Sequence, residues 1–198
     1  MSFISPLERD KNAFVAVSAS NDKWQGSEYL QLSPHLMTAA QLKKAARAVQ
    51  CAQHIFLDYS GDTSAQLAFL LDCKCLNSLK GLYVSSMHLV GNVALLCAVL
   101  ARTKQLQFLE LQLPQSNGKM SDSYGELFRV IAQLPLVSLS LHSYFRWNND
   151  QENFDASDRA LCDMVLQLRP TLLSLSLQYE AADCFVHFFP HDQQTAPL

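Results

Sequence analysis

The 198-residue sequence has few charged residues and no strong excess of either sign. Only 17% of its residues are Asp, Glu, Lys or Arg, and the formal net charge at pH 7 is −3. Binding to nucleic acid or to an anionic membrane surface needs a patch that concentrates positive charge. The composition therefore predicts that neither nucleic acid nor a membrane is a partner.

Long hydrophobic runs and targeting signals are also missing. The longest apolar stretch, Val93 to Ala101, is far shorter than the roughly 20 residues that a membrane-spanning helix needs. The first residues, MSFISPLERDKNAF, contain no basic region followed by an apolar run, so no secretory signal is expected. A hydrophobic content of 49% instead predicts a compact globular protein.

The six cysteines do not show the spacing of a metal site. No CxxC pair occurs, and Cys73-Lys-Cys75 has no further ligands at zinc spacing, so neither a metal nor another cofactor is expected. Most of the cysteines lie within or at the end of apolar helical patterns, where free cysteine behaves as a small hydrophobic residue. We therefore predict buried free thiols in a reducing compartment, which indicates a cytoplasmic protein.

The chain does contain one short sequence pattern that recurs several times. The template L-x-x-L-x-L fits residues 79–84, 106–111, 136–141 and 172–177, and looser copies occupy residues 27–32 and 52–57. The fourth positions of the six copies follow one another at intervals of 25, 27, 27, 30 and 36 residues. A period in this range indicates a stack of similar units, each of which covers the apolar face of its neighbour.

The segments between the copies carry helical patterns. Capping-box sequences begin at Thr38 and Ser123, and Pro135 and Pro170 follow where helices should already have ended. Apolar residues recur at helical spacing in five segments: Ala39, Leu42, Ala46 and Val49; Leu67, Leu70 and Leu71; Val93, Leu96, Cys97 and Leu100; Leu127, Ile131 and Leu134; Leu161, Met164, Val165 and Leu168. Each unit is therefore predicted to be a strand, a loop, a helix and a return loop.

Alternation along each strand predicts which side chains face the helices. In residues 138–142, Leu139 and Leu141 point to one side of the strand, and the serines and His142 between them point to the other. A doubly wound parallel sheet would need strands that are apolar on both faces. The expected fold class is therefore an α/β solenoid of about six strand–helix repeats, with a parallel sheet and outer helices.

This layout resembles the leucine-rich-repeat family, and repeats of this length with a full helix resemble its ribonuclease-inhibitor-like class. The resemblance covers roughly residues 27–180 and implies a concave strand face that binds partners. Residues 1–26 are expected to form an amino-terminal cap, and residues 181–198 a cap strand with a flexible tail. The repeats are degenerate, because the family's Asn or Cys three residues after the last strand leucine is replaced by His35, Ser60, Met87, Pro114, Tyr144 and Glu180.

The outward positions of the predicted strands carry aromatic and acidic side chains in the amino-terminal units. Large rigid side chains are typical anchors of interfaces, and carboxylates beside them suit a partner with basic and apolar groups. Two alternatives stay open: residues 1–26 cover the rings, or cross-strand pairs merely stabilise the sheet. The residues predicted to bind a partner protein here are Tyr29, His54, Phe56, Asp58, Tyr83, Phe108, Glu110 and His142.

A long segment, residues 144–154, precedes the last expected helix. Insertions in repeats form loops on one face, often a binding face, and Arg with aromatic residues is typical of interfaces. Phe145, Arg146 and Trp147 are therefore added to the predicted partner-binding residues. The alternative is that the aromatic residues of this segment pack beneath the loop.

No catalytic motif appears in the sequence. Cys184 and His187 could form a nucleophile pair, but Cys184, Val186 and Phe188 alternate like a strand that caps the last unit. His54 and Asp58 are interpreted as surface polar residues rather than an acid–base pair.

The function expected from the sequence is noncatalytic recognition of another protein, with no small-molecule substrate. Small, irregular repeat domains of this kind are similar to those of effector proteins that intracellular bacteria deliver into host cells, which would place the protein in a host-cell cytosol. The alternatives are a cysteine-dependent enzyme that uses Cys184 and His187, and a structural subunit that forms homodimers.

Overall fold

The computed structural model describes residues 15–16, 26–32, 38, 40, 43, 46, 49, 51–57, 63–85, 92–113, 123–143, 156–179 and 185–186. In chain order the elements are β1 (Val15–Ala16), β2 (Tyr29–Leu32), β3 (His54–Leu57), α3 (Thr63–Asp72), the 3-10 helix η4 (Lys74–Ser78), β4 (Gly81–Val84), α4 (Val93–Arg102), β5 (Phe108–Leu113), α5 (Ser123–Ile131), β6 (Ser138–Ser143), α6 (Ala156–Leu168), β7 (Ser174–Tyr179) and β8 (Phe185–Val186).

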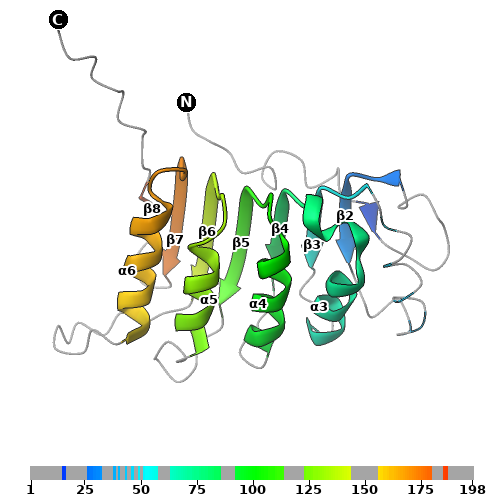
Figure 1. Cartoon of the computed structure of the whole chain (residues 1–198), viewed down its shortest axis with the longest axis horizontal. Coiled ribbons are helices and arrows are strands. Elements are labelled where there is room, and N and C mark those ends of the chain that lie inside the picture. The colour runs from blue at the N-terminus through cyan, green and yellow to red at the C-terminus, as the bar shows by residue number, and fades with distance from the viewer. Residues whose placement is uncertain are drawn as a thin grey trace, which may run out of the picture.

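The strands form one sheet in which spatial order equals chain order. Strands β1 to β7 run parallel, and β8 pairs antiparallel with β7. Helices α3 to α6 all lie on one side of this sheet (Figure 1). The predicted α/β class, with a parallel sheet and helices covering one face, is confirmed. β1 belongs to the segment expected to form the amino-terminal cap, and β8 lies where a terminal strand was predicted around Cys184.

The register of the sheet places equivalent positions of the six sequence copies side by side. Each fourth-position residue pairs with the next one along the chain: Leu30, Ile55, Leu82, Leu109, Leu139 and Leu175. All six are buried. The spacing of the leucine phrase therefore predicted the strand register correctly, although the intervals vary from 25 to 36 residues.

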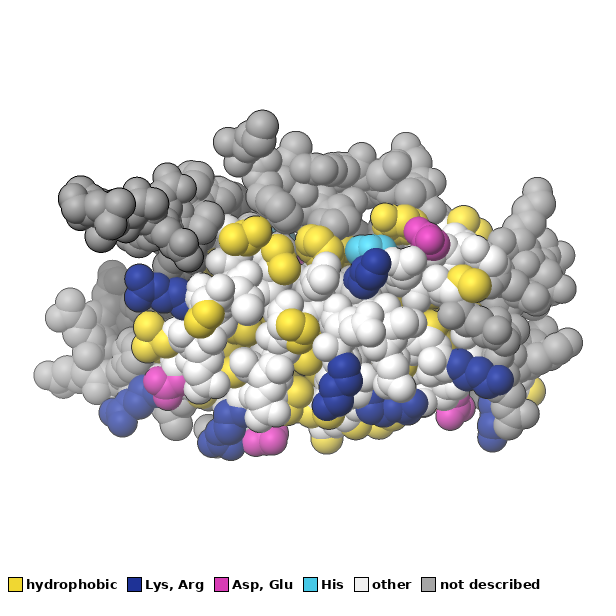
Figure 2. All heavy atoms as spheres, turned by 45° about the horizontal axis from the view of Figure 1, so that its top comes forward, with side chains coloured by type: hydrophobic (Ala, Val, Ile, Leu, Met, Phe, Trp, Pro, Cys, Tyr) yellow, Lys and Arg dark blue, Asp and Glu magenta, His cyan; other side chains and the backbone are white. Residues whose placement is uncertain are grey.

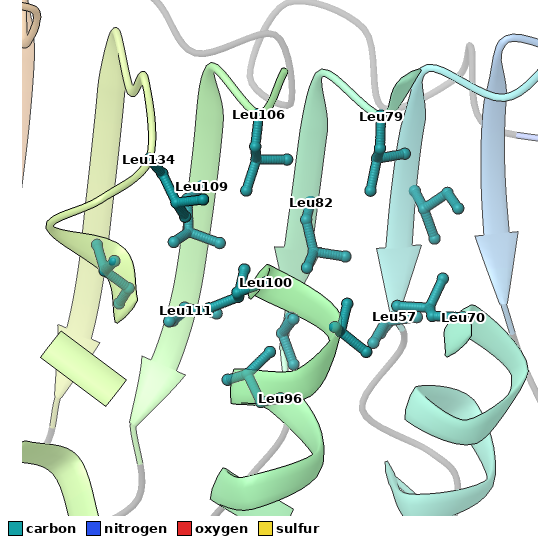
Figure 3. Close-up of a cluster of buried hydrophobic side chains, with 14 of the residues drawn as sticks. Leu57, Leu70, Leu79, Leu82, Leu96, Leu100, Leu106, Leu109, Leu111 and Leu134 are labelled. Atoms are coloured by element: carbon teal, nitrogen blue, oxygen red, sulfur yellow. The ribbon is translucent and has the colours of Figure 1, made fainter. Parts of the chain in front are cut away.

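The hydrophobic core lies between the sheet and the helices. Leucines that point inward from the strands meet leucines from the helices, as Figure 3 shows for Leu82 and Leu109 opposite Leu96 and Leu100. Each buried leucine contributes about 1.5–3 kcal/mol relative to an exposed one. The helical residues that complete this layer are Leu67, Leu70, Val99, Leu127, Phe128, Ile131, Met164 and Leu168.

A row of backbone hydrogen bonds joins the units at the amino-terminal ends of the strands. In each case the carbonyl before one strand accepts from two consecutive N–H groups of the next unit at 2.7–3.1 Å. The accepting carbonyls belong to Glu28, Gln53, Lys80, Gln107 and Val137. At this end of the strands the backbone itself satisfies the turns, so no side-chain ladder is needed there.

Hydroxyl side chains accompany the helix ends. Thr103 Oγ1 donates to the carbonyl of Leu100 at 2.7 Å, and Thr171 Oγ1 donates to that of Leu168 at 3.2 Å. Each hydroxyl adds to backbone N–H groups after the helix that donate to the same carbonyl: that of Thr103 to Leu100, and those of Thr171 and Leu172 to Leu168. Helices α5 and α6 end before Pro135 and Pro170, as predicted.

The cysteines only partly follow the prediction. Within the described part of the chain all five are free thiols, and Cys73 and Cys75 are buried. Cys51 and Cys162 are exposed, so the prediction of burial is wrong for them. Cys162 lies two residues before the buried Met164 on α6, a spacing that puts the two side chains on opposite sides of a helix.

None of the described helices has the length and apolar character to cross a bilayer.

Candidate functional site

The side chains between the inward leucines lie on the sheet face opposite the helices, here called the outer face. The register aligns them in rows across the strands. The first row is Tyr29, His54, Gly81, Phe108, Ser138 and Ser174, and the second is Gln31, Phe56, Tyr83, Glu110, Ser140 and Ser176. Gln112 and His142 pair in a third row. The outer face is thus aromatic over β2 to β5 and carries small polar groups over β6 and β7.

Three aromatic rings of the outer face, those of Tyr29, Tyr83 and Phe108, gather around the ring of His54. The ring of Tyr29 stacks on it, with centroids 4.7 Å apart and planes 5° from parallel. The rings of Tyr83 and Phe108 have centroids 6.2 and 5.9 Å from that of His54. His54 Nδ1 lies 3.3 Å from the hydroxyl oxygen of Tyr83. We call these four residues, together with Gly81, the His54 cluster.

Gly81 makes the cluster possible because it leaves space between two strands. A Cβ atom at this position would lie 2.2 Å from His54 Nδ1 and 2.8 Å from the Tyr83 hydroxyl oxygen. Neighbouring strands are about 4.8 Å apart, so β3 and β5 are separated by roughly twice that distance. The rings of His54 and Phe108 approach each other across β4 because no side chain stands between them.

The exposure predicted for the outer face is wrong at several positions. Tyr83 and His54 are buried, with 2% and 7% of their surface exposed, and Ser138 and Ser174 are buried as well. Tyr83 is not beneath the helices: it contacts His54 over Gly81 and does not join the leucine core. Alternation predicts the face of a sheet but not how far a ring leans over a neighbouring glycine.

The environment fixes the protonation states of the two central groups. Burial of the ring and the positive charge of Lys80 lower the pKa of His54 from its usual 6.5, and the carboxylate of Glu28 opposes them. Burial, with the nearby Glu110, raises the pKa of Tyr83. At neutral pH His54 is therefore uncharged and Tyr83 keeps its proton. In Figure 2, which turns the amino-terminal ends of the strands toward the viewer, a histidine lies beside basic and acidic side chains.

A second group on the outer face consists of Glu110, Ser140 and His142. His142 Nε2 lies 3.4 Å from Glu110 Oε1 and 3.0 Å from Ser140 Oγ. Both Glu110 and His142 are partly exposed, at 24% and 31% of their side-chain surface. Alternation along single strands does not predict this group. The register could have revealed it, because it puts Glu110 directly beside Ser140 and one row from His142.

The geometry of this group differs from that of a catalytic triad. Glu110 Oε1 and Ser140 Oγ both approach the same ring nitrogen, Nε2 of His142. In a catalytic triad the serine and the acid bind opposite nitrogens of the ring, so that one nitrogen takes the serine proton while the acid holds the other. Glu110, Ser140 and His142 form a polar patch on the outer face.

The structure brings most of the predicted binding residues onto one face. Tyr29, His54, Tyr83 and Phe108 form the His54 cluster, Phe56 pairs with Tyr83 in the second row, and Glu110 and His142 lie beyond it. The remaining predictions fall outside the described residues: Asp58, Phe145, Arg146 and Trp147, together with the alternative catalytic pair Cys184 and His187.

Two further tests bear on this site: whether its residues could hold a metal ion, and whether the chain is similar to known proteins. No cluster of three or more His, Cys, Asp or Glu side chains within the described ranges could hold a metal ion. Comparison of the chain with protein-family models, curated proteins and solved structures found no match. The chemistry of the outer face is therefore the basis for inferring function.

Proposed function

We propose that this protein is a noncatalytic recognition module of the leucine-rich-repeat type, similar to the ribonuclease-inhibitor-like class, and that its outer face binds a partner protein. The six copies of the leucine pattern lie on neighbouring strands of one parallel sheet, each paired in register with the next, which supports a solenoid of this kind. In a solenoid the strand face offers a continuous surface to which each unit contributes a few side chains. The free thiols Cys73 and Cys75 favour a cytosolic setting, including that of a host cell.

The observation that carries the proposal is a run of partly exposed aromatic rings beside a carboxylate. Tyr29, Phe56 and Phe108 are all partly exposed, and Glu110 lies next to Tyr83 in the second row. Among the described residues of the three rows there is no Lys or Arg, and Glu110 is the one carboxylate. This surface complements a partner that presents an apolar side chain and a basic group together.

The energetics of such a surface divide unequally between the rings and the charge. Anchoring aromatic residues contribute about 2 kcal/mol or more when they are desolvated by a partner. A partly exposed ion pair contributes about 0.2–1 kcal/mol. The rings would therefore supply most of the affinity, and Glu110 would select for a basic partner. Ser140 and Glu110 approach the same nitrogen of His142, unlike the serine and acid of a catalytic triad, which supports a binding role over hydrolysis.

Changing the outer face should weaken partner binding strongly without unfolding the protein. The double variant Phe56→Ser with Glu110→Lys removes one anchor and reverses one charge, so affinity should fall about 30-fold or more. The full chain, immobilised, would first capture its partner from candidate cell lysates, and the affinity of the identified partner would then be measured by calorimetry. Neither residue belongs to the leucine core.

The matched control is Leu166→Ser. Leu166 is the most exposed large hydrophobic residue among the described ones, at 65%, and lies on α6, on the helical side of the sheet (Figure 1). The Leu166→Ser variant should bind the partner with the same affinity as the unmodified chain. Equal loss in both variants, or no loss in the double variant, would refute the outer face as the binding surface. Light scattering of the free protein distinguishes a second copy of the chain as the partner.

A further inference from the structure

We propose that the His54 cluster is a proton-sensitive latch, which ties β2, β4 and β5 to β3 while His54 is neutral and loosens when His54 takes up a proton. The ring of His54 contacts one residue from each of these three strands: Tyr29, Tyr83 and Phe108. A charge placed on this ring therefore acts on four strands at once.

The space around the ring cannot readily admit water. The imidazole ring of His54 lies over Gly81 of β4. It fills the space that a side chain at this position would occupy. Tyr83, whose hydroxyl lies 3.3 Å from Nδ1, is also buried. An imidazolium formed here would exchange the solvation of bulk water for the faces of three rings and one phenol oxygen.

The charged and titratable groups around His54 come from two of the neighbouring segments. On the β2 side they are Tyr29 and Glu28, and on the β4 side they are Tyr83 and Lys80, whereas β5 contributes the uncharged Phe108. Lys80 repels an imidazolium and Glu28 attracts it. The carboxylate of Glu28 is exposed and also accepts from Gln53 Nε2 at 3.2 Å, so solvent and this bond weaken its attraction.

The sign of the effect follows from these contacts. Burial is the largest influence on His54 and lowers its pKa below the usual 6.5, so an opened or unfolded cluster binds a proton at higher pH than the closed one does. The latch is therefore fully closed above about pH 6.5 and loses this stabilisation as the pH falls toward the lowered pKa. The rings attract an imidazolium by cation–π contacts, but burial outweighs that attraction.

Hydrogen exchange of backbone amides tests the latch directly. Exchange would be followed on the full chain at about pH 7.5 and about pH 5, each corrected for the intrinsic exchange rate at that pH. Protection of the amides of β2, β3 and β4 should fall about tenfold in acid for each unit by which the pKa of His54 is lowered. Protection of β6 and β7, which contribute no residue to the His54 cluster, should stay within about twofold.

Two variants separate the latch from a general effect of acid. His54→Phe keeps a flat ring but cannot be protonated, so the acid-induced loss of protection in β2 to β4 should disappear. His142→Gln removes the other described histidine of the outer face and should leave that loss intact. Retention of the loss in His54→Phe, its absence in the unmodified chain, or an equal loss in β6 and β7 would overturn the proposal.

Titration of the His54 ring by nuclear magnetic resonance tests the latch even if the His54→Phe variant does not fold. The ring Cε1–H resonance of His54 in the unmodified chain should titrate below pH 6.5, and a midpoint at or above that value would contradict the latch. Gly81→Ala should show weak protection of β2 to β4 already at neutral pH, because the added methyl group displaces the ring. The inference does not depend on the proposed binding function, since its readout is the backbone of the protein alone.

Discussion

Replacing Leu82 by alanine is expected to lower the free energy of unfolding by about 2–5 kcal/mol. Leu82 has no exposed surface and pairs with Ile55 on one side and Leu109 on the other. Its side chain points from the middle of the sheet toward the helices (Figure 3). The neighbours that would have to fill the cavity are held by the sheet ladder on both sides, so the site collapses poorly. Urea denaturation followed by circular dichroism measures the change.

The comparison for Leu82 is Leu166→Ala, which removes the same atoms from an exposed helical position. Leu166 is 65% exposed, so its replacement should change the free energy of unfolding by no more than about 0.5 kcal/mol. Two equal and small effects would mean that Leu82 is not in a core between sheet and helices. That result would remove the physical basis for the register of leucines.

Gly81→Ala should lower the free energy of unfolding by about 1–3 kcal/mol, toward the upper end of that range. A Cβ atom at 2.2 Å from His54 Nδ1 and 2.8 Å from the Tyr83 hydroxyl oxygen cannot be accommodated without moving both rings. The stack of His54 on Tyr29 would be lost together with the contact to Phe108. Thermal and urea unfolding of the variant measure the cost.

Gly125→Ala is the matched control for Gly81. Gly125 lies in helix α5, and no neighbouring atom lies within 4 Å of an added Cβ atom. Because alanine is favoured over glycine inside a helix by about 0.5–1 kcal/mol, this variant should be more stable than the unmodified chain. If both glycine variants shift stability in the same direction, the close packing around Gly81 is not what makes that position sensitive.

Much of the fold could be predicted because one physical requirement recurs in every unit. A strand covered by helices on one side needs an apolar residue at every second position, and the next unit needs the same. The phrase around Leu139 and its copy around Leu175 meet this requirement with nearly identical letters. Their period identified the strands, their order and their register without reference to any other protein.

The site could be predicted only in part, because its contacts depend on four strands together. Alternation put His54, Tyr83 and Phe108 on the outer face. The burial of His54 and Tyr83, however, follows from the missing side chain of Gly81, which lies on the strand between those of His54 and Phe108. Sequence patterns describe one strand at a time and say nothing about a ring that leans across its neighbour. Exposure was therefore wrongly predicted for His54 and Tyr83.

The chemistry of the polar patch of Glu110, Ser140 and His142 also could not be predicted from the sequence alone. Ser140, His142 and Glu110 are residue types found in hydrolases, and the register alone would bring them together. Which ring nitrogen faces the carboxylate decides whether the serine can be activated, and this depends on side-chain geometry that no spacing encodes. Here both partners meet Nε2, which favours a surface that binds over one that reacts.

The central claim is that successive units stack in chain order with their fourth-position leucines turned to a common core. Methyl–methyl nuclear Overhauser effects in protein labelled at Ile, Leu and Val methyl groups test it most directly, since adjacent strands are about 4.8 Å apart. Contacts should connect Ile55 to Leu82, Leu82 to Leu109 and Leu109 to Leu139, each in turn. A spectrum in which Leu82 contacts Leu139 but not Leu109 would contradict the stack and the outer face built on it.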